Sequence, residues 1–369
     1  MAAFIVLVHH FFLGFSPFTT GLLDVARDAH SLIGNPLFVF VNGTGAVSFF
    51  FTLSGFVLCW SLLRYPQPGK IAQAAIKRWP RLVLLVLLNT LISCTLFKLD
   101  LYFFDQAAKV SASPWLAEFG YAGWTPAFEA SYLSAAIQGL TTFVTGVVTY
   151  NTNLWTMQPE FVGSMVVYGL VHWRVSRLQN GHPLLGIGLV AVFFLIFLRK
   201  LFPFVLGVML CVQLLRVPAK SRLWVSGLCM LVGLYALGYM IAADWYAWVQ
   251  YLPRFWQDRS QTLMHTFGSL LIIYATMTNG QIFQGLNGRL CQWLGRLSFP
   301  LYLVHVLVIH SISSYVFLLS SGSGLATHWV LAGTFLITVL VSVLASLPLS
   351  VLDEWWVRQV NQTVKRWWP

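Results

Sequence analysis

Residues 329–351 read WVLAGTFLITVLVSVLASLPLSV, a run that contains no charged side chain. A helix needs roughly 20 apolar residues to cross the hydrocarbon of a bilayer, and this run is long enough. Similar runs recur along the chain, in which 58% of residues are hydrophobic and 9% are charged. Ordinary soluble domains carry about 25% charged residues. Because a soluble protein of this composition could not cover its surface with polar side chains, the sequence predicts an integral membrane protein.

The fold class follows from the unbroken form of these runs. Strands of membrane β-barrels alternate in polarity over stretches of about 10 residues, and these segments do not alternate. Every backbone amide in hydrocarbon must find a partner within the protein, so continuous apolar runs indicate helices. We therefore predict an all-α, polytopic transmembrane helical bundle that forms a single domain over residues 1–369, with no room for a sizeable soluble domain.

The apolar segments predict about ten spanning helices. In chain order the segments are 1–15, 37–63, 82–104, 161–173, 184–198, 202–215, 223–242, 264–279, 297–319 and 329–351. The first is short: fifteen residues of helix reach only about 22 Å. It has no basic region before it and no small-residue cleavage site, which argues against a signal peptide. We interpret the chain as beginning inside its first helix.

The basic residues predict an orientation. If the N-terminus is cytosolic and the segments alternate, fifteen of the 22 Lys and Arg residues face the cytosol, five face the other side, and Arg199 and Lys200 lie against the trend. The cytosolic set is Arg64, Lys70, Lys77, Arg78, Arg81, Arg174, Arg177, Arg216, Lys220, Arg222, Arg289, Arg296, Arg358, Lys365 and Arg366. The opposite set is Arg27, Lys98, Lys109, Arg254 and Arg259. This bias predicts a multi-pass protein with both termini cytosolic. It also accounts for the net charge of +11 without a nucleic-acid partner, and the expected neighbour is membrane lipid, some of it anionic.

Two adjacent histidines lie within the first segment. Ionisable groups inside a membrane are costly, and by default they mark function or a buried pairing. His9 and His10 point about 100° apart on a helix, so at most one can face the bundle interior squarely. A neutral imidazole accepts a proton near physiological pH, which suits a general base. A histidine that merely hydrogen-bonds a neighbouring helix explains the pattern equally well.

Two later stretches carry further candidates. In LWTMQPEFVGS, Trp155 precedes Glu160, which falls in the first turn of a helix where the dipole favours an acid. This pattern is also that of an ordinary helix start. In LGRLSFPLYLVH, His305 lies deep in the ninth segment, five residues before His310. A buried histidine bonded to a carbonyl would look the same.

A basic cluster leads into the third segment from the predicted cytosolic side. Lys77, Arg78 and Arg81 in IKRWPRL have the chemistry to hold phosphates by charge-assisted hydrogen bonds. The positive-inside rule predicts such clusters on its own, so the cluster alone does not indicate a binding site. It gains meaning from its place among the other motifs.

Five short motifs occur along the chain in a fixed order. They are AAFIVLVHHF, FFFTLSGFVL with its Ser-Gly-Phe end, KRWPRL with two arginines three apart, LWTMQPEF with the pattern Leu-Trp-(Ser/Thr)-x-x-x-Glu, and LGRLSFPLYLVH with Gly-x-x-Ser and Tyr-Leu-x-His. In this order the chain resembles the acyltransferase-3 family of membrane-bound O-acyltransferases. The resemblance covers nearly the whole chain, and the first and fourth motifs are similar to fungal members.

The resemblance implies an O-acyltransferase that transfers groups other than aminoacyl groups. The acyl group, in the first place acetyl, would pass from acyl-CoA to a hydroxyl of a small molecule, glycan or lipid. Acyl-CoA would be the co-substrate, with no bound cofactor and no metal. The resemblance assigns catalysis to His10, His9 and Glu160, and acyl-CoA binding to Lys77, Arg78 and Arg81. It assigns supporting roles to Ser54, Trp155, Ser298, Tyr302 and His305.

The first helix departs from the family pattern. Family members carry an arginine eleven positions before the essential histidine, and this sequence has none. An Arg-Gly pair directly before residue 1 would place that spacing at His10, so His10 is preferred to His9. Ser54 and Gly55 are small and are expected first of all to allow close helix approach.

Two other functions stay open at this point. A transporter or exporter of a lipid or small polar solute would also have polar residues near mid-membrane, although no repeat symmetry is visible. A catalytically inactive relative would fit the absent arginine. Release of CoA separates an acyltransferase from both. The segment 105–153 is the longest outside the predicted spans and is expected to cover the acceptor site, but its sequence does not identify the acceptor.

Overall fold

The computed structural model describes residues 2–20, 31–176, 183–240 and 243–367. Within these ranges all regular structure is helical and no β-strand occurs, which confirms the all-α class. The α-helices are α1 Ala2–Phe15, α2 Pro17–Thr20, α3 Gly43–Leu63, α4 Lys70–Lys98, α5 Phe104–Ser111, α6 Pro114–Ala117, α7 Tyr132–Thr145, α8 Met157–Ser176, α9 Pro183–Phe197, α10 Phe202–Arg216, α11 Leu223–Leu237, α12 Arg254–Gln257, α13 Ser260–Thr278, α14 Gly280–Leu286, α15 Arg289–Val308, α16 Ser314–Ser321 and α17 Thr327–Trp367. The 3-10 helices are η1 Leu32–Gly34, η2 Pro36–Phe40, η3 Thr152–Thr156, η4 Arg199–Leu201 and η5 Asp244–Tyr251, and η6 Ile309–Ser313 is a π-helix.

Each predicted apolar segment coincides with a helix of the structure. The matching elements are α1, α3, α4, α8, α9, α10, α11, α13, the continuous α15–η6–α16, and α17. Among the described helices, four are long and apolar enough to cross a membrane, namely Gly43–Leu63, Lys70–Lys98, Arg289–Ser321 and Thr327–Trp367. Ala2–Phe15, Leu184–Phe197 and Leu223–Leu237 are apolar but shorter. These helices identify an integral membrane protein, and the figure of about ten crossings stays a prediction. Of the residues used to predict the orientation, Arg27 and Arg177 lie outside the described residues.

Two helix boundaries differ from the prediction. The second segment was expected from residue 37, but α3 begins at Gly43 because the side chain of Asn42 caps it, accepting from the Gly45 amide at 3.1 Å. The third segment was expected from residue 82, but α4 begins at Lys70. Residues 70–78, KIAQAAIKR, are mostly good helix formers, so the basic motif lies within the helix and not in a loop.

Glycines set the closest helix contacts of the bundle. A Cβ atom on Gly55 of α3 would lie 2.2 Å from the carbonyl oxygen of Phe204, and one on Gly207 of α10 would lie 2.2 Å from that of Thr52. The two backbones therefore touch, which confirms the close approach expected at Gly55. The segment 105–153 holds α5, α6 and α7, and α7 packs along α4.

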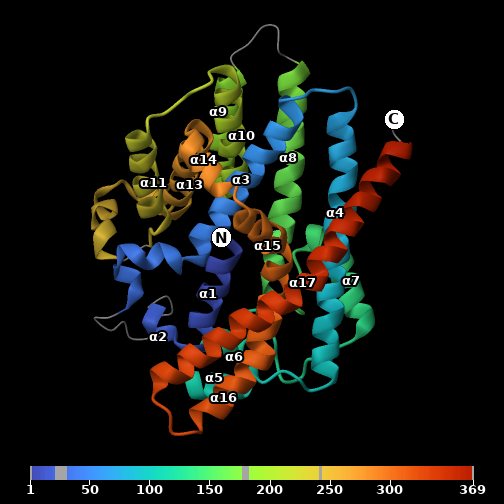
Figure 1. Cartoon of the computed structure of the whole chain (residues 1–369), viewed down its shortest axis with the longest axis vertical. Coiled ribbons are helices and arrows are strands. Elements are labelled where there is room, and N and C mark those ends of the chain that lie inside the picture. The colour runs from blue at the N-terminus through green and yellow to red at the C-terminus, as the bar shows by residue number, and fades with distance from the viewer. Residues whose placement is uncertain (1, 21–30, 177–182, 241–242, 368–369) are drawn as a thin grey trace.

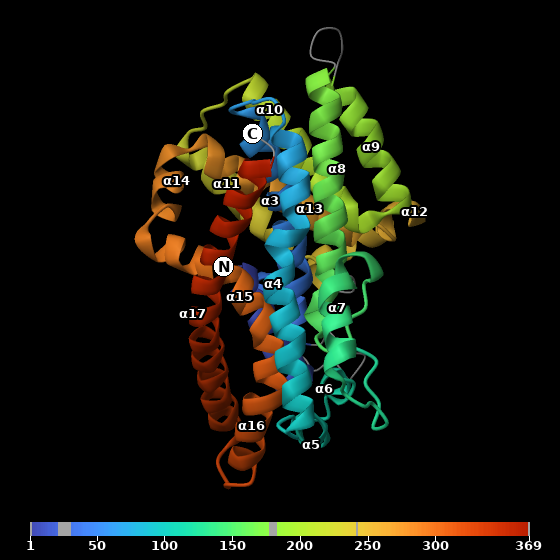
Figure 2. The ribbon, with the colours of Figure 1, turned by 90° about the vertical axis from the view of Figure 1, so that its right-hand side faces the viewer.

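Several helices and their connections lie at one or the other end of the long axis of the molecule (Figure 1). The α3–α4 connection and the C-terminal ends of α10 and α17 lie at the upper end, whereas α5 and α16 lie at the lower end. Helix α1 starts near the middle of this axis and contacts α3, α15 and α17. Figure 2 shows α4, α7 and α8 side by side, each in contact with the other two. The α1–α15 contact brings His10 against α15.

Candidate active site

His10 of α1 and His305 of α15 meet inside the bundle. The Nδ1 atom of His10 lies 3.0 Å from Nε2 of His305, and the nearly parallel rings have centroids 5.3 Å apart. His305 is fully buried, whereas His10 is half-buried. Among the described residues, the side chain of His10 makes its hydrogen bond through Nδ1 and makes none through Nε2. The structure thus joins two predicted site residues and leaves one ring nitrogen of His10 available to another molecule.

Asn153 of η3 is the third member of this group. Its Nδ2 atom lies 3.1 Å from Nε2 of His305 and donates to the carbonyl oxygen of Tyr302 at 3.0 Å. The other ring nitrogen of His305, Nδ1, donates to the carbonyl oxygen of Leu301 at 2.9 Å. The Tyr302 hydroxyl lies 3.2 Å from the Asn153 carbonyl and 3.0 Å from the Thr156 hydroxyl. The predicted supporting residues Tyr302 and His305 therefore belong to one network.

Two further asparagines hold η3 in place beside α15. Asn151 donates to Oδ1 of Asn89 at 2.7 Å and to the carbonyl of Leu303 at 2.8 Å. The side chain of Asn89 of α4 donates to the same carbonyl at 2.9 Å. The backbone amide of Asn153 donates to Oδ1 of Asn151 at 2.9 Å. All three asparagines are buried. Because a buried amide must be hydrogen-bonded, these contacts fix η3 between α4 and α15.

Aromatic rings form the other wall of the group. The ring of His10 stacks on Trp115 of α6, with centroids 5.0 Å apart at 11°. Trp115 also contacts His310, 5.0 Å away, and His310 packs against Phe119 and Phe104. Trp115 and His310 are both buried. This wall orients the His10 ring and excludes water from that side.

His310 lies in the π-helical turn η6. Its Nδ1 donates to the carbonyl of Val306 at 2.8 Å, and its own carbonyl accepts from the Phe103 amide at 3.0 Å. Its Nε2 is buried and has no partner among the described residues. Single π-turns within helices frequently occur at functional sites. Here the turn lets α15 reach α5 without ending.

His9 has a different set of neighbours. Its Nδ1 donates to the carbonyl of Val41 at 2.9 Å. Its ring lies over Gly43, where a Cβ atom would come within 2.6 Å of the imidazole. His9 therefore ties α1 to the start of α3, and it takes no part in the His10–His305 contact. The two adjacent histidines are both half-buried and face different helices, His9 the start of α3 and His10 α15.

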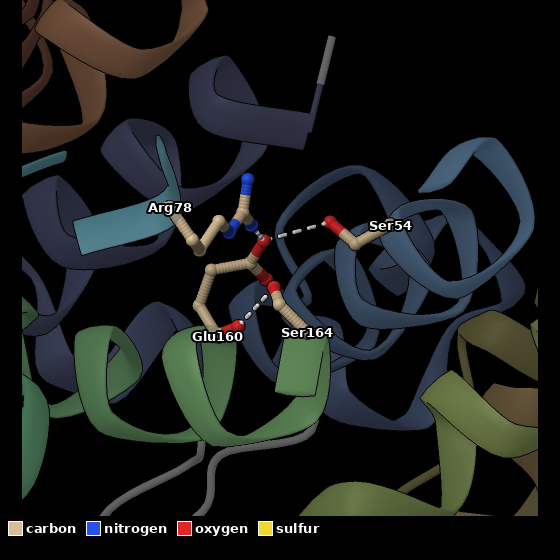
Figure 3. A network of polar contacts seen from close by, with 4 residues as sticks. All are labelled: Ser54, Arg78, Glu160 and Ser164. Atoms are coloured by element: carbon tan, nitrogen blue, oxygen red, sulfur yellow. Dashed lines mark hydrogen bonds and ion pairs between the residues drawn. The ribbon is translucent and has the colours of Figure 1, made fainter. Parts of the chain in front are cut away.

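A second polar group joins α3, α4 and α8 (Figure 3). Arg78 and Glu160 form a buried ion pair. The exposed fraction of Arg78 is 8% and that of Glu160 is 3%. The Ser54 hydroxyl donates to Oε1 of Glu160 at 3.1 Å, and the Ser164 hydroxyl donates to the Glu160 carbonyl at 2.6 Å. Nε of Arg78 and Oε2 of Glu160 are buried without a partner among the described residues. Such a pair holds its helices together because separating it would leave a buried charge alone.

This pairing changes the expected roles of two residues. Glu160 was expected to act beside His10, but its charged partner is Arg78, and within the described residues it makes no hydrogen bond to either histidine. Arg78 was expected to bind acyl-CoA with Arg81, but Arg78 is buried while Arg81 is exposed and Lys77 is half-buried. Glu160 follows Asn153 by seven residues, roughly 10 Å of helix. The η3–α8 segment thus serves both polar groups.

Two expected supporting residues lie apart from the histidines. Trp155 faces the turn between α9 and α10, where the Lys200 ammonium lies 4.8 Å from its ring centroid. Ser298 is half-buried on α15, and it makes no hydrogen bond within the described part of the chain. The structure therefore unites His10, His305 and Tyr302, and separately Ser54, Arg78 and Glu160.

Sequence reasoning missed Asn153 and Trp115. Asn153 directly precedes the LWTMQPEF motif, with Asn151 two residues before it. Asparagines at such positions usually indicate a turn or a helix cap, and Asn151 does cap η3. The only signal for a site was two asparagines close to a motif. Trp115 lies in the long outer segment, which offered no apolar pattern to place it.

A comparison with protein families agrees with the motifs. The family model for an acyltransferase domain matches residues 1–347, which include both polar groups. The chain belongs to the acyltransferase-3 family. No curated protein and no solved structure matches it. Membership of the acyltransferase-3 family, together with the long apolar helices, indicates a membrane acyltransferase.

Proposed function

We propose that this protein is a membrane-bound O-acyltransferase that transfers an acyl group, in the first place acetyl, from acyl-CoA to a hydroxyl group. The observation that carries the proposal is the His10–His305 contact, which occupies Nδ1 of His10 and leaves Nε2 unpaired. A general base needs such a nitrogen within reach of the acceptor. The half-buried position of His10 gives a hydroxyl access to it, while the aromatic wall limits water.

The proton and the acyl group move in two steps. Nε2 of His10 takes the proton from the acceptor hydroxyl as that oxygen attacks the thioester carbonyl carbon. The tetrahedral intermediate then breaks its carbon–sulfur bond, and the CoA sulfur leaves with the proton from His10. The products are an ester and free CoA, and His10 returns to its neutral form. Limited access of water to His10 would reduce hydrolysis of the thioester.

The donor needs a cationic site for its phosphates. Because Arg78 is neutralised by Glu160, we assign this role to Lys77 and the exposed Arg81 of α4. Lys365 near the end of α17 lies close enough to Lys77 for the two charges to repel each other. An anion placed between like charges relieves their repulsion and receives charge-assisted hydrogen bonds. Arg78 and Glu160 then connect this region to the histidines by fixing α4 against α8.

An acyl-transfer assay tests the proposal. The purified full chain in lipid nanodiscs receives radiolabelled acetyl-CoA and a panel of sugars, sterols and glycerolipids, and both free CoA and the labelled ester are measured. His10→Ala is expected to lower kcat by about 10²–10⁴-fold. The control is His328→Ala, because His328 is exposed at the start of α17, and its activity should equal that of the wild type. The double variant Lys77→Ala with Arg81→Ala should raise the KM for acetyl-CoA more than it lowers kcat.

Three outcomes would each contradict a part of the proposal. If no acceptor stimulates CoA release by the wild type, the protein is not an acyltransferase for these classes of acceptor. If His10→Ala keeps full activity, His10 is not the base. An unchanged KM in the double variant would remove Lys77 and Arg81 from the donor site.

A further inference from the structure

Two backbone carbonyls determine where the protons of the histidine group lie. A carbonyl oxygen only accepts hydrogen bonds. Nδ1 of His305 lies 2.9 Å from the carbonyl of Leu301, so Nδ1 carries a proton and donates it. The carbonyl oxygen of Tyr302 lies 3.0 Å from the nearer terminal atom of the Asn153 side chain. Because that atom must be a donor, it is the NH₂ group, and this fixes the orientation of the side-chain amide. Its second N–H is available for Nε2 of His305, 3.1 Å away.

The proton on His10 follows from these two assignments. Because neutral His305 carries its proton on Nδ1, its Nε2 is an acceptor, as the Asn153 donor also requires. Nδ1 of His10, 3.0 Å from that acceptor, must therefore be the donor. A neutral imidazole has only one ring proton, so the lone pair of His10 is on Nε2. That nitrogen makes no hydrogen bond to another described residue.

We infer that Asn153 and His305 are positioning residues, which hold His10 in the tautomer that carries its proton on Nδ1. This inference rests on the proposed role of His10 as the general base. In the opposite tautomer, Nε2 would carry a proton and could not take one from an acceptor. The Leu301 carbonyl selects the His305 tautomer, and the Asn153 amide, a neutral donor, disfavours a second proton on that ring. Asn153 is itself held by the Asn151 side chain and the Tyr302 carbonyl.

Two substitutions at Asn153 separate this role from simple packing. Asn153→Asp keeps the size of the side chain but replaces the donor by an acceptor. Its carboxylate should draw a proton from solvent to Nε2 of His305, whose Nδ1 keeps the proton donated to the Leu301 carbonyl, so that the ring becomes cationic. Nε2 of His305 then no longer accepts from Nδ1 of His10, and the His10 proton moves to Nε2. Asn153→Ala removes the donor but leaves the Leu301 carbonyl to select the tautomer. Asn153→Asp should therefore be the more damaging change, whereas a packing role predicts that Asn153→Ala is.

The first measurement reads the tautomers directly and needs no activity. ¹⁵N NMR of protein carrying labelled histidine distinguishes a protonated from an unprotonated ring nitrogen, and His10→Ala and His305→Ala assign the two sets of signals. In the wild type both rings are expected to carry a single proton, on Nδ1. A wild-type spectrum with the His10 proton on Nε2 would overturn the inference. This test stands even if Asn153→Asp does not fold.

The second measurement is kinetic and uses the acyl-transfer assay. Asn153→Asp should lower kcat by about 10–100-fold, which is the loss typical of removing a group that orients a metal-ligating histidine. The KM for acetyl-CoA should change less than twofold, since the donor site is not touched. The control is Asn279→Ala, which removes hydrogen bonds of another buried asparagine at the α13–α14 junction and should leave kcat unchanged. Equal kcat values for Asn153→Asp and the wild type would overturn the inference.

The two proposals fail in different ways. If the wild type releases no CoA but shows both histidines protonated on Nδ1, the proposed reaction fails and the assignment of the protons stands. If the wild type transfers acyl groups but its His10 proton lies on Nε2, the acyl-transfer activity stands, whereas the positioning role and Nε2 of His10 as the base both fail.

Discussion

At the scale of single residues, the Arg78–Glu160 ion pair allows the stability cost of an unpaired charge inside the bundle to be tested. Removing one partner leaves an uncompensated buried charge, which costs about 3–5 kcal/mol. We therefore expect Arg78→Met and Glu160→Leu each to lower the thermal unfolding midpoint strongly. The double variant should recover most of the loss, because apolar side chains of similar volume often replace a buried ion pair without net cost. The measurement is the unfolding midpoint of the purified protein in detergent.

The chain offers a matched control for this prediction. Arg296 and Glu354 form an ion pair at 3.7 Å between two exposed side chains. Exposed pairs contribute about 0–1 kcal/mol, so Arg296→Met should barely change the midpoint. If the losses from Arg78→Met and Glu160→Leu simply add in the double variant, the two residues do not act as a pair.

The candidate site could be predicted from the sequence only where a side chain was unusual by itself. His10 and His305 stood out because ionisable groups are rare in apolar segments, and the structure brings them together. Asn153 did not stand out, since asparagine is common near helix starts and its role depends on α15 lying beside η3. The partner of Arg78 was hidden for a similar reason. A basic residue near a helix end satisfies the positive-inside rule with or without an acid across the bundle.

At the scale of helices, the apolar pattern located the elements well and their ends less well. Runs of apolar residues predicted α3, α15 and α17 because the membrane constrains length and composition together. The start of α4 was missed by about three turns, because residues 70–78 are helical but interrupted by one glutamine and three basic side chains. Hydropathy does not detect a helix that extends beyond the apolar region. The short elements α5 and α6 had no such signal at all, and α6 carries Trp115.

The α3–α10 contact leads to a prediction about glycine. A Cβ atom on Gly55 would lie 2.2 Å from a backbone oxygen of α10, and backbone cannot rotate away as a side chain can. Overpacking usually costs about 1–3 kcal/mol, and we expect Gly55→Ala to lower stability by at least this amount. Gly333→Ala is the control, because nothing lies within 4 Å of a Cβ there. Replacing that helical glycine should raise stability by about 0.5–1 kcal/mol. Thermal unfolding in detergent measures both, and equal shifts of the same sign would contradict the packing argument.

At the scale of the whole molecule, the basic residues used to predict the orientation can be placed along the long axis. The α3–α4 connection, which contains Arg64, lies at the upper end of the long axis, as does the last turn of α17 with Lys365 and Arg366 (Figure 1). Helix α5, which contains Lys109, lies at the opposite end. Charges predicted for opposite sides thus lie at opposite ends. Which of the two ends faces the cytosol, and with it the side of the C-terminus, stays a prediction from the positive-inside rule.

The number of crossings determines which connections share a side of the membrane. Between the α3–α4 connection and the α16–α17 connection lie α4, α8, α9, α10, α11, α13 and the continuous α15–η6–α16. If all seven cross, the two connections face opposite sides. If only the four helices that are long enough cross, just α4 and Arg289–Ser321 lie between them, and the connections face the same side. The number of crossings between the two connections is therefore odd in the ten-span topology and even in the four-span topology.

Cysteine labelling can read this parity directly. Gln67 and Ser323 are exposed in the two connections, so Gln67→Cys and Ser323→Cys would each present one accessible thiol. The background carries Cys229→Ala and Cys291→Ala, because these two cysteines are partly exposed and the other three are buried. In sealed membrane vesicles with their cytosolic side outward, a membrane-impermeant maleimide should label Gln67→Cys, whereas Ser323→Cys should react only after permeabilisation. The unsubstituted background should stay unlabelled under both conditions. Labelling of both positions from the same side would contradict seven crossings between them and support the four-span arrangement.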